Sequence, residues 1–173
     1  MKRGTAILLS ALAALAAHGQ AAPVFPSLKG ADLNGRSLSL PGDFTGPFSL
    51  VFVAFEMRQQ ADVDSWRPFV EQARSKRPAL GVFELPTIAQ GFRLMQFVIN
   101  NGMRSGITDR ETRAATVTLY TDVAAFKRAL GVESTKEIAV LVVTPTGGIL
   151  ARVSGRYSEE AAVPIEKALS AGG

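Results

Sequence analysis

The sequence predicts an α/β protein whose central sheet carries helices on both faces. Residues 50–55 and 138–143 are apolar at nearly every position, which is typical of strands that are buried on both sides. Soon after the first run, apolar side chains recur three and four residues apart, as on an amphipathic helix. They are Val63, Trp66, Phe69, Val70 and Ala73. Buried strand, short turn and helix open an α/β unit.

Before the first buried run, the segment 29–40 is predicted to form a β-hairpin. Its turn is Asp32-Leu33-Asn34-Gly35-Arg36, and Asn-Gly between apolar residues is a strong hairpin signal. Residues 41–47 contain two prolines and two glycines, which separate the hairpin from the strand. The first helix is expected to end near Lys76, because Pro78 cannot continue it.

The second half of the chain alternates strands and helices. We expect a strand over 80–85, a break at Pro86-Thr87, and a helix over 88–103 that stops at Gly102. An irregular basic segment over 104–113 follows. The remaining elements are a strand over 116–121, a helix from Asp122 to about Leu130, the buried run 138–143, an antiparallel return strand over 149–153, and a helix from Ser158 to Leu169.

The N-terminus has the pattern of a secretory signal peptide. Lys2 and Arg3 precede a short apolar run over 6–17, and small residues follow it. We therefore expect residues 1–21 to be a leader that is cleaved after Ala21, and residues 22–173 to form one domain. A membrane anchor is the alternative, but the run is shorter than the roughly 20 apolar residues that a span needs. The expected location is periplasmic or secreted, in a bacterial cell envelope.

Composition excludes several kinds of chemistry. The chain has no cysteine, and its one histidine, His18, lies in the expected leader. The mature chain would therefore lack thiols and imidazoles, which argues against thiol redox catalysis, nucleophilic catalysis by Cys or His, and most zinc or copper sites. Without Lys2 and Arg3, 17 basic side chains face 15 acidic ones, too small an excess to predict nucleic-acid binding. We expect no enzyme activity, no cofactor and no metal.

The order of elements resembles the thioredoxin-like fold, in a variant with an N-terminal hairpin. The resemblance rests on Phe25-Pro26, the turn over 32–36, the strand over 50–55 and the terminal stretch IAVLVVTPTGGILARVSG. In that family the redox cysteines would fall within 58–61, and a cis-proline would precede the strand near Glu137-Ile138. Both features are absent, so the resemblance implies the fold without disulfide exchange or peroxide reduction.

A narrower resemblance is to the mitochondrial ATP synthase assembly factor family, which is also thioredoxin-like. It is carried by FPSLKGADLNG, VFVAFEMRQQADVDSWRPF, FRLMQFVINNGMRSGITDRETRAATVTLYTD and FKRALGV. The best matching features are Gly102-Met103-Arg104 with Ile107, and Tyr120-Thr121-Asp122. The resemblance implies help in joining the membrane-embedded proton-channel subunit to the rotor ring. An exported bacterial relative need not share that role.

The basic segment is the leading candidate site. Arg104, Arg110 and Arg113 lie close together in the chain with Asp109, and guanidinium groups suit the recognition of carboxylates. The alternative is a solvated loop whose charges pair with one another. Arg58 lies where the resembled thioredoxin-like family has its active-site turn. There it is either part of a retained peptide-binding surface or an ordinary helix-start residue. Trp66 is expected in the core.

These observations favour a non-catalytic binding or assembly protein, chaperone-like toward a membrane complex such as ATP synthase. The expected partner is a protein, with no nucleic acid and no membrane span after cleavage, and the oligomeric state stays open. Two alternatives remain. One is a thiol-disulfide or peroxide oxidoreductase relative that works with a partner's cysteine, and the other is a small-ligand carrier.

Overall fold

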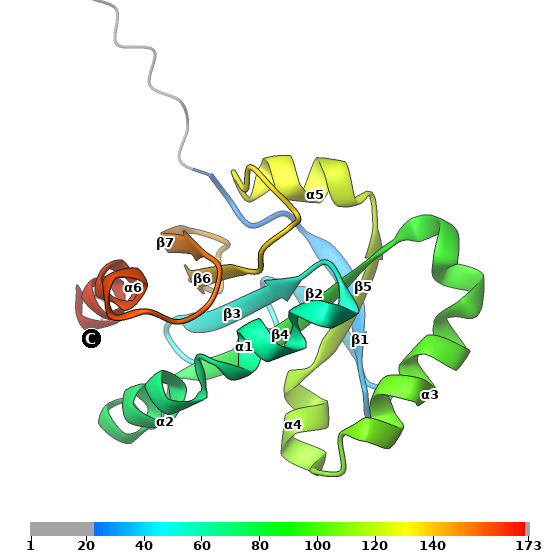
Figure 1. Ribbon diagram of the computed structural model, residues 1–173, viewed down its shortest axis with the longest axis horizontal. Coiled ribbons are helices and arrows are strands. Elements are labelled where there is room, and N and C mark those ends of the chain that lie inside the picture. The colour runs from blue at the N-terminus through cyan, green and yellow to red at the C-terminus, as the bar shows by residue number, and fades with distance from the viewer. Residues whose placement is uncertain (1–22, 172–173) are drawn as a thin grey trace, which may run out of the picture.

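The computed structural model describes residues 23–171, so the expected leader over 1–21 lies outside the described part of the chain (Figure 1). The fold is built on one seven-stranded sheet with the strand order β2-β1-β5-β4-β3-β6-β7. The strands are β1 (Leu28–Asp32), β2 (Ser37–Leu40), β3 (Ser49–Ala54), β4 (Gly81–Ala89), β5 (Val117–Thr121), β6 (Ala139–Val143) and β7 (Ile149–Ser154).

Helical segments connect these strands. They are the 3-10 turns η1 (Met57–Gln59) and η2 (Gln90–Met95), and the helices α1 (Gln60–Asp64), α2 (Arg67–Lys76), α3 (Gln96–Gly106), α4 (Arg110–Ala115), α5 (Val123–Ala129) and α6 (Glu159–Ala171). The N-terminal hairpin, the α5 cap at Asp122 and the start of α6 after Ser158 agree with the sequence-based expectation.

The sheet is mixed, as predicted. β3, β4 and β5 run parallel at its centre, while β6 and β7 extend it antiparallel on one side and the β1–β2 hairpin extends it on the other. Every residue of β3 and β6 is buried, so the apolar runs formed the strands that the sequence predicted. Because β3, β4 and β5 are parallel, the segments that follow them meet at one edge of the sheet, and the segments that precede them meet at the opposite edge.

Two hydrophobic cores lie on the two faces of the sheet. On one face, Phe126 and Leu130 from α5 and its end pack with Phe25 and Phe44. On the other face, side chains of α2 and α6 pack over β3 and β6. Trp66 lies in this second core with no exposed surface, and its Nε1 donates a hydrogen bond to the Gly155 carbonyl at 3.1 Å. Its expected place in the core is confirmed.

The first predicted helix is divided in two. α1 ends at Asp64 and α2 begins at Arg67, with Pro68 in the first turn of α2. Proline has no N–H and its ring clashes with the carbonyl four residues earlier, which favours a break before Pro68. The effect depends on context, because Pro164 is accommodated inside α6. α2 ends at Lys76, as expected.

The predicted break at Pro86-Thr87 was wrong, because β4 continues through it to Ala89. Pro86 lies opposite Ala54, the last residue of β3, and Thr87 is the first of three β4 residues in register with β5. Proline therefore stands at the end of the β3–β4 ladder, while pairing on the β5 side extends from the Glu84–Thr116 bridge to Ala89. A missing N–H is tolerated at such a point better than within a continuous ladder.

The helix predicted over 88–103 and the irregular segment predicted over 104–113 both need correction. α3 begins only at Gln96 and runs through Gly102 to Gly106. Gly102 is not among the glycines with positive φ, so it does not form the left-handed cap that often ends a helix. Arg104 therefore lies in α3, Arg110 and Arg113 lie in α4, and only residues 107–109 are irregular.

Candidate partner-binding site

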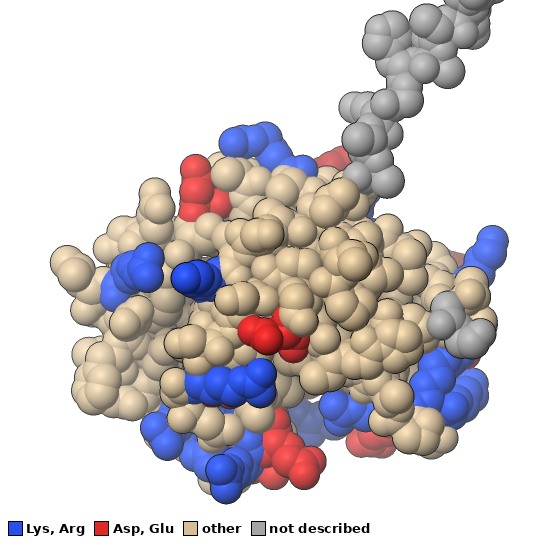
Figure 2. Space-filling view, turned by 180° about the vertical axis from the view of Figure 1, so that it is seen from behind, with Lys and Arg blue, Asp and Glu red and all other residues tan. Residues whose placement is uncertain are grey.

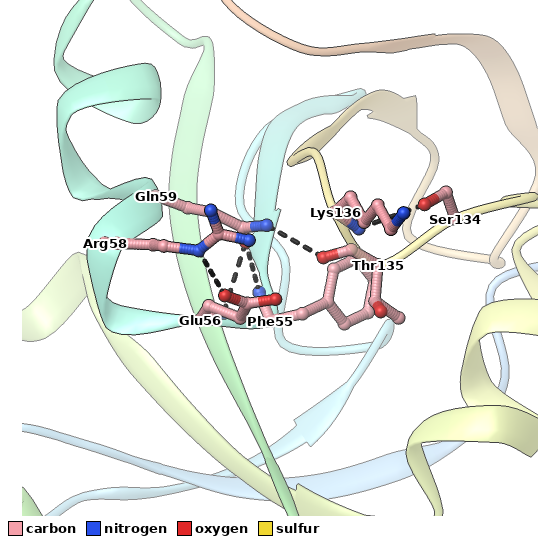
Figure 3. Close-up of polar contacts among 7 residues, drawn as sticks. All are labelled: Phe55, Glu56, Arg58, Gln59, Ser134, Thr135 and Lys136. Atoms are coloured by element: carbon pink, nitrogen blue, oxygen red, sulfur yellow. Dashed lines mark hydrogen bonds and ion pairs between the residues drawn. The ribbon is translucent and has the colours of Figure 1, made fainter.

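The side chain of Gln59 holds the turn after β3 in place from its buried side. Its side chain is buried, with 1% of its surface exposed. Its Oε1 accepts hydrogen bonds from the N–H groups of Phe55 at 2.8 Å and Glu56 at 3.2 Å, and its Nε2 donates to the Thr135 carbonyl at 2.8 Å (Figure 3). These bonds tie the turn to the loop that precedes β6 and satisfy buried polar groups that would otherwise be costly.

The outer surface of this turn is exposed, and its side chains are polar except for that of Met57. Arg58 and Glu56 form an ion pair, and the hydrogen bond from Arg58 holds the pKa of the Glu56 carboxyl below its usual value. Met57 has 95% of its surface exposed. Across the described residues, no group of three or more His, Cys, Asp or Glu side chains could hold a metal ion. The turn therefore has a buried amide on its inner side, and an ion pair and an exposed methionine on its outer side.

The N-terminal hairpin positions the candidate arginines of α4, Arg110 and Arg113. The Leu33 N–H donates to the Arg113 carbonyl at 3.0 Å, and the Asn34 side-chain amide donates to the Arg110 carbonyl at 3.0 Å. The Asn-Gly turn that the sequence predicted therefore fixes α4 as well as reversing the chain. Arg110 and Arg113 are three residues apart in α4, so they share one face of that helix.

Asp109 has a local role at the start of α4. Its carboxylate accepts hydrogen bonds from the Thr112 N–H at 2.6 Å and the Thr112 hydroxyl at 2.7 Å. The Thr112 N–H bond is the main reason that the pKa of this carboxyl lies below its usual value. Asp109 is thus the N-cap of α4.

The arginines of α3 and α4 form no ion pair with Asp109, Glu111 or Asp122 in the described structure. Arg104 and Arg110 are exposed, whereas Arg113 is half-buried and its Nε lacks a hydrogen-bond partner. Asp122 instead caps α5 through the Ala125 N–H at 3.0 Å. Arg113 nevertheless lies near enough to Asp109 for its charge to help lower the pKa of that carboxyl.

Arg58 and the other candidate arginines do not form one site. η1 follows β3, while α4 precedes β5, and β3 and β5 point the same way in the sheet. Arg58 therefore lies at one edge of the sheet, and Arg110 and Arg113 lie at the opposite edge. The structure contains two separate polar surfaces in place of the single set of candidate residues.

The sequence did not predict an exposed apolar segment. Phe92, Met95, Phe97 and Val98 lie within the helix predicted over 88–103, yet each has more than half of its surface exposed. The pattern itself was visible in the sequence. An amphipathic segment without acidic residues fits binding to another molecule or surface as well as packing against the protein core. Periodicity alone does not tell the two apart.

We compared the chain with known proteins. No protein-family model matches its sequence, and no curated protein matches it. Solved structures do match: the thioredoxin domain of a thiol-disulfide oxidoreductase from Bacteroides vulgatus has a TM-score of 0.52 and 20% sequence identity, and the match covers 86% of this chain and 97% of that chain. The exposed lipoprotein thioredoxin of Streptococcus pneumoniae has a TM-score of 0.56 at 14% identity, covering 84% and 99%.

A thiol-disulfide oxidoreductase from Bacteroides fragilis gives a TM-score of 0.52 at 13% identity, with coverage of 84% of this chain and 98% of that one. At such identities the likeness establishes the fold alone. The chain therefore has a thioredoxin-like fold, as the order of elements predicted. It contains no cysteine, so the thiols on which disulfide exchange depends are absent.

Proposed function

We propose that this protein is a non-catalytic, thioredoxin-like binding protein that assists the assembly of a membrane complex in the cell envelope. The observation that carries the proposal is Gln59. In the turn where thioredoxin-like enzymes hold their reactive thiols, this chain has a buried amide whose hydrogen bonds join Phe55, Glu56 and Thr135. Such a turn is stabilised as structure and has no group to exchange electrons.

Partner recognition would fall to the arginines of α3 and α4. Arg104 and Arg110 are exposed, and neither they nor Arg113 form an ion pair among residues 23–171. Guanidinium groups on one helix face suit an acidic segment of a partner, since each can bind a carboxylate through two hydrogen bonds. The resemblance to the ATP synthase assembly factors supports a subunit of that complex as the partner.

The leader pattern at the N-terminus supports an envelope location, and one of the matching structures is an exposed lipoprotein thioredoxin. Within residues 23–171 the structure has no helix that is both long and apolar enough to cross a membrane. We propose that the folded domain lies outside the cytoplasm and reaches the complex from the exported side.

Affinity capture from an envelope extract tests the proposal. Wild-type protein should retain a defined protein partner, and a variant that combines Arg104→Ala, Arg110→Ala and Arg113→Ala should lose it. Arg74→Ala is the matched control, because Arg74 is exposed on α2 and has no ion pair among the described residues. Equal capture by the triple variant would contradict the assigned surface, and capture of nothing by wild type would contradict the function.

The enzyme alternative is tested separately. In an insulin or peroxide reduction assay, the protein should give no turnover above a control without protein. Sustained turnover, alone or with an added partner thiol, would favour the oxidoreductase relative. Native mass spectrometry of the purified protein tests the carrier alternative, which predicts a bound small molecule at a fixed mass difference.

A further inference from the structure

An exposed apolar patch lies on η2 and the first turn of α3. Its side chains are unusually free of protein contacts: Leu94 is 99% exposed and Phe97 is 75% exposed. The patch comprises Phe92, Leu94, Met95, Phe97 and Val98, all of which are more than half exposed. Single exposed apolar residues are common on proteins, but five within seven positions of the chain point to a surface that another body covers.

The fold holds this patch away from the protein core. α3 contains no buried residue, and its inner side is formed by half-buried side chains such as Ile99 and Met103. One hydrogen bond attaches the helix to the sheet, from the Tyr120 hydroxyl to Asn100 Oδ1 at 3.0 Å. Figure 1 shows α3 at the periphery of the molecule, beyond the sheet. Phe97 and Val98 therefore point outward on the side of α3 opposite Ile99 and Met103.

The shape of the patch indicates that it binds to a soft, extended surface and not within a groove. A side chain that lines a groove loses exposure to the groove walls, but Leu94 and Phe97 retain most of theirs. Each of these two side chains projects from the surface by itself, as do side chains that anchor a protein in a fluid lipid layer. In Figure 2, the left edge of the molecule, which is the side of α3, is formed mostly by projecting uncharged side chains with Lys or Arg among them.

The charge of the segment indicates which kind of surface it binds. Residues 85–108 contain Arg93 and Arg104 and no acidic residue, so the segment that carries the patch has a net positive charge. Apolar anchors beside arginines are the combination by which interfacial helices bind anionic lipid surfaces.

We propose that η2 and the first turn of α3 dock this protein on an anionic phospholipid surface. Phe92, Leu94 and Phe97 enter the boundary between headgroups and acyl chains, and Arg93 lies among the lipid phosphates. Binding is reversible, because a few apolar side chains and arginines give far less affinity than a membrane span. The inference is independent of the protein partner, since it needs lipid alone.

Co-sedimentation with vesicles tests it, with protein produced from the full-length gene and processed by the cell. Binding should be at least about tenfold stronger to vesicles that contain phosphatidylglycerol than to pure phosphatidylcholine, and it should weaken as salt increases. The double variant Leu94→Ser/Phe97→Ser should lower binding to the anionic vesicles by about tenfold or more, and Arg93→Glu should lower it and reduce its salt dependence.

The matched controls are Val163→Ser, which removes a 65% exposed apolar side chain from α6, and Arg74→Gln on α2. Both should bind like wild type, and circular dichroism should show that every variant is folded. Any leader that remains contributes equally to all proteins, so the differences report on the patch. Equal binding by wild type and Leu94→Ser/Phe97→Ser, or no preference for anionic lipid, overturns the proposal.

Two other outcomes also overturn it. If wild type self-associates in sedimentation velocity and Leu94→Ser/Phe97→Ser does not, while neither binds vesicles, the patch is an interface between two copies of the chain. If the double variant loses a captured protein partner but binds anionic vesicles as wild type does, the patch belongs to protein recognition. Because the vesicle assay contains no protein partner, its failure leaves the proposed function untouched.

Discussion

Gln59 and Thr135, 76 residues apart in the chain, are joined by a 2.8 Å hydrogen bond from the side-chain amide of one to the main-chain carbonyl of the other. This bond links the turn after β3 to the loop before β6. The bond satisfies the buried Gln59 amide and a main-chain carbonyl, so the two segments stabilise each other.

Gln59→Leu should destabilise the protein by about 1–3 kcal/mol, because it leaves the Phe55 N–H and the Thr135 carbonyl without the partners that the amide supplies. The unfolding midpoint in urea can be followed by the fluorescence of Trp66, the one tryptophan of the chain. Gln72→Leu is the control, because Gln72 is exposed on α2. A loss as small for Gln59→Leu as for Gln72→Leu would show that the hydrogen bonds of Gln59 contribute little.

Trp66→Ala should cost about 3–5 kcal/mol, near the limit of what a domain of this size tolerates. Trp66 is fully buried, packs edge-on against Phe69 and Tyr157, and donates a hydrogen bond to Gly155. Far-ultraviolet circular dichroism during thermal unfolding gives the measurement, since the fluorophore is removed. Trp66→Phe should cost less, and similar losses for the two variants would mean that ring packing does not dominate.

The sequence predicted the parts of the fold that depend on local composition. The apolar runs became β3 and β6, and Asn34-Gly35 became the hairpin turn. Prolines and glycines were harder to interpret, because their effect depends on their neighbours. Pro68 divided a helix, whereas Pro86 was accommodated in β4 and Gly102 in α3.

The candidate site was less predictable for a related reason. Arg110 and Arg113 could be chosen from the sequence, but their separation from Arg58 follows from the parallel direction of β3 and β5, which is a long-range property. The role of Gln59 depends on Thr135, which no local pattern connects to it. The exposure of Leu94 and Phe97 depends on what the fold leaves uncovered, and hydrophobic periodicity does not contain that information.

Glu84→Gln should raise the melting temperature at neutral pH. Burial of Glu84 in β4 raises the pKa of its carboxyl above the usual value, and the charge of Asp64 raises it further. Since the folded pKa exceeds the unfolded one, the folded state favours the protonated form, and that contribution to stability is lost as the pH rises through the folded pKa. The glutamine, which carries no charge, avoids this loss.

The advantage of Glu84→Gln should therefore disappear below about pH 4, where the wild-type carboxyl is protonated in both states. Melting curves of both proteins between pH 3.5 and about 8 measure the difference. Glu71→Gln on the exposed surface of α2 serves as the control for removing one charge. A constant difference at all pH values would place the effect of Glu84→Gln in packing and not in ionisation.

The arginines of α3 and α4 give the prediction that separates recognition from structure. Arg104 and Arg110 are exposed and have no ion pair among the described residues, so alanine at either position should change the melting temperature little. Binding of the captured partner should weaken for both variants and become less sensitive to salt, because a charge contact is lost.

Arg113 should behave differently in one respect. It is half-buried and its Nε has no hydrogen-bond partner, so Arg113→Ala removes packing by the side-chain stem together with a charge that costs desolvation. We expect a stability change within about 1 kcal/mol in either direction and weaker partner binding. Calorimetry and a binding titration on the same preparations decide the matter: a large stability loss with unchanged affinity would make Arg113 a structural residue and restrict recognition to Arg104 and Arg110.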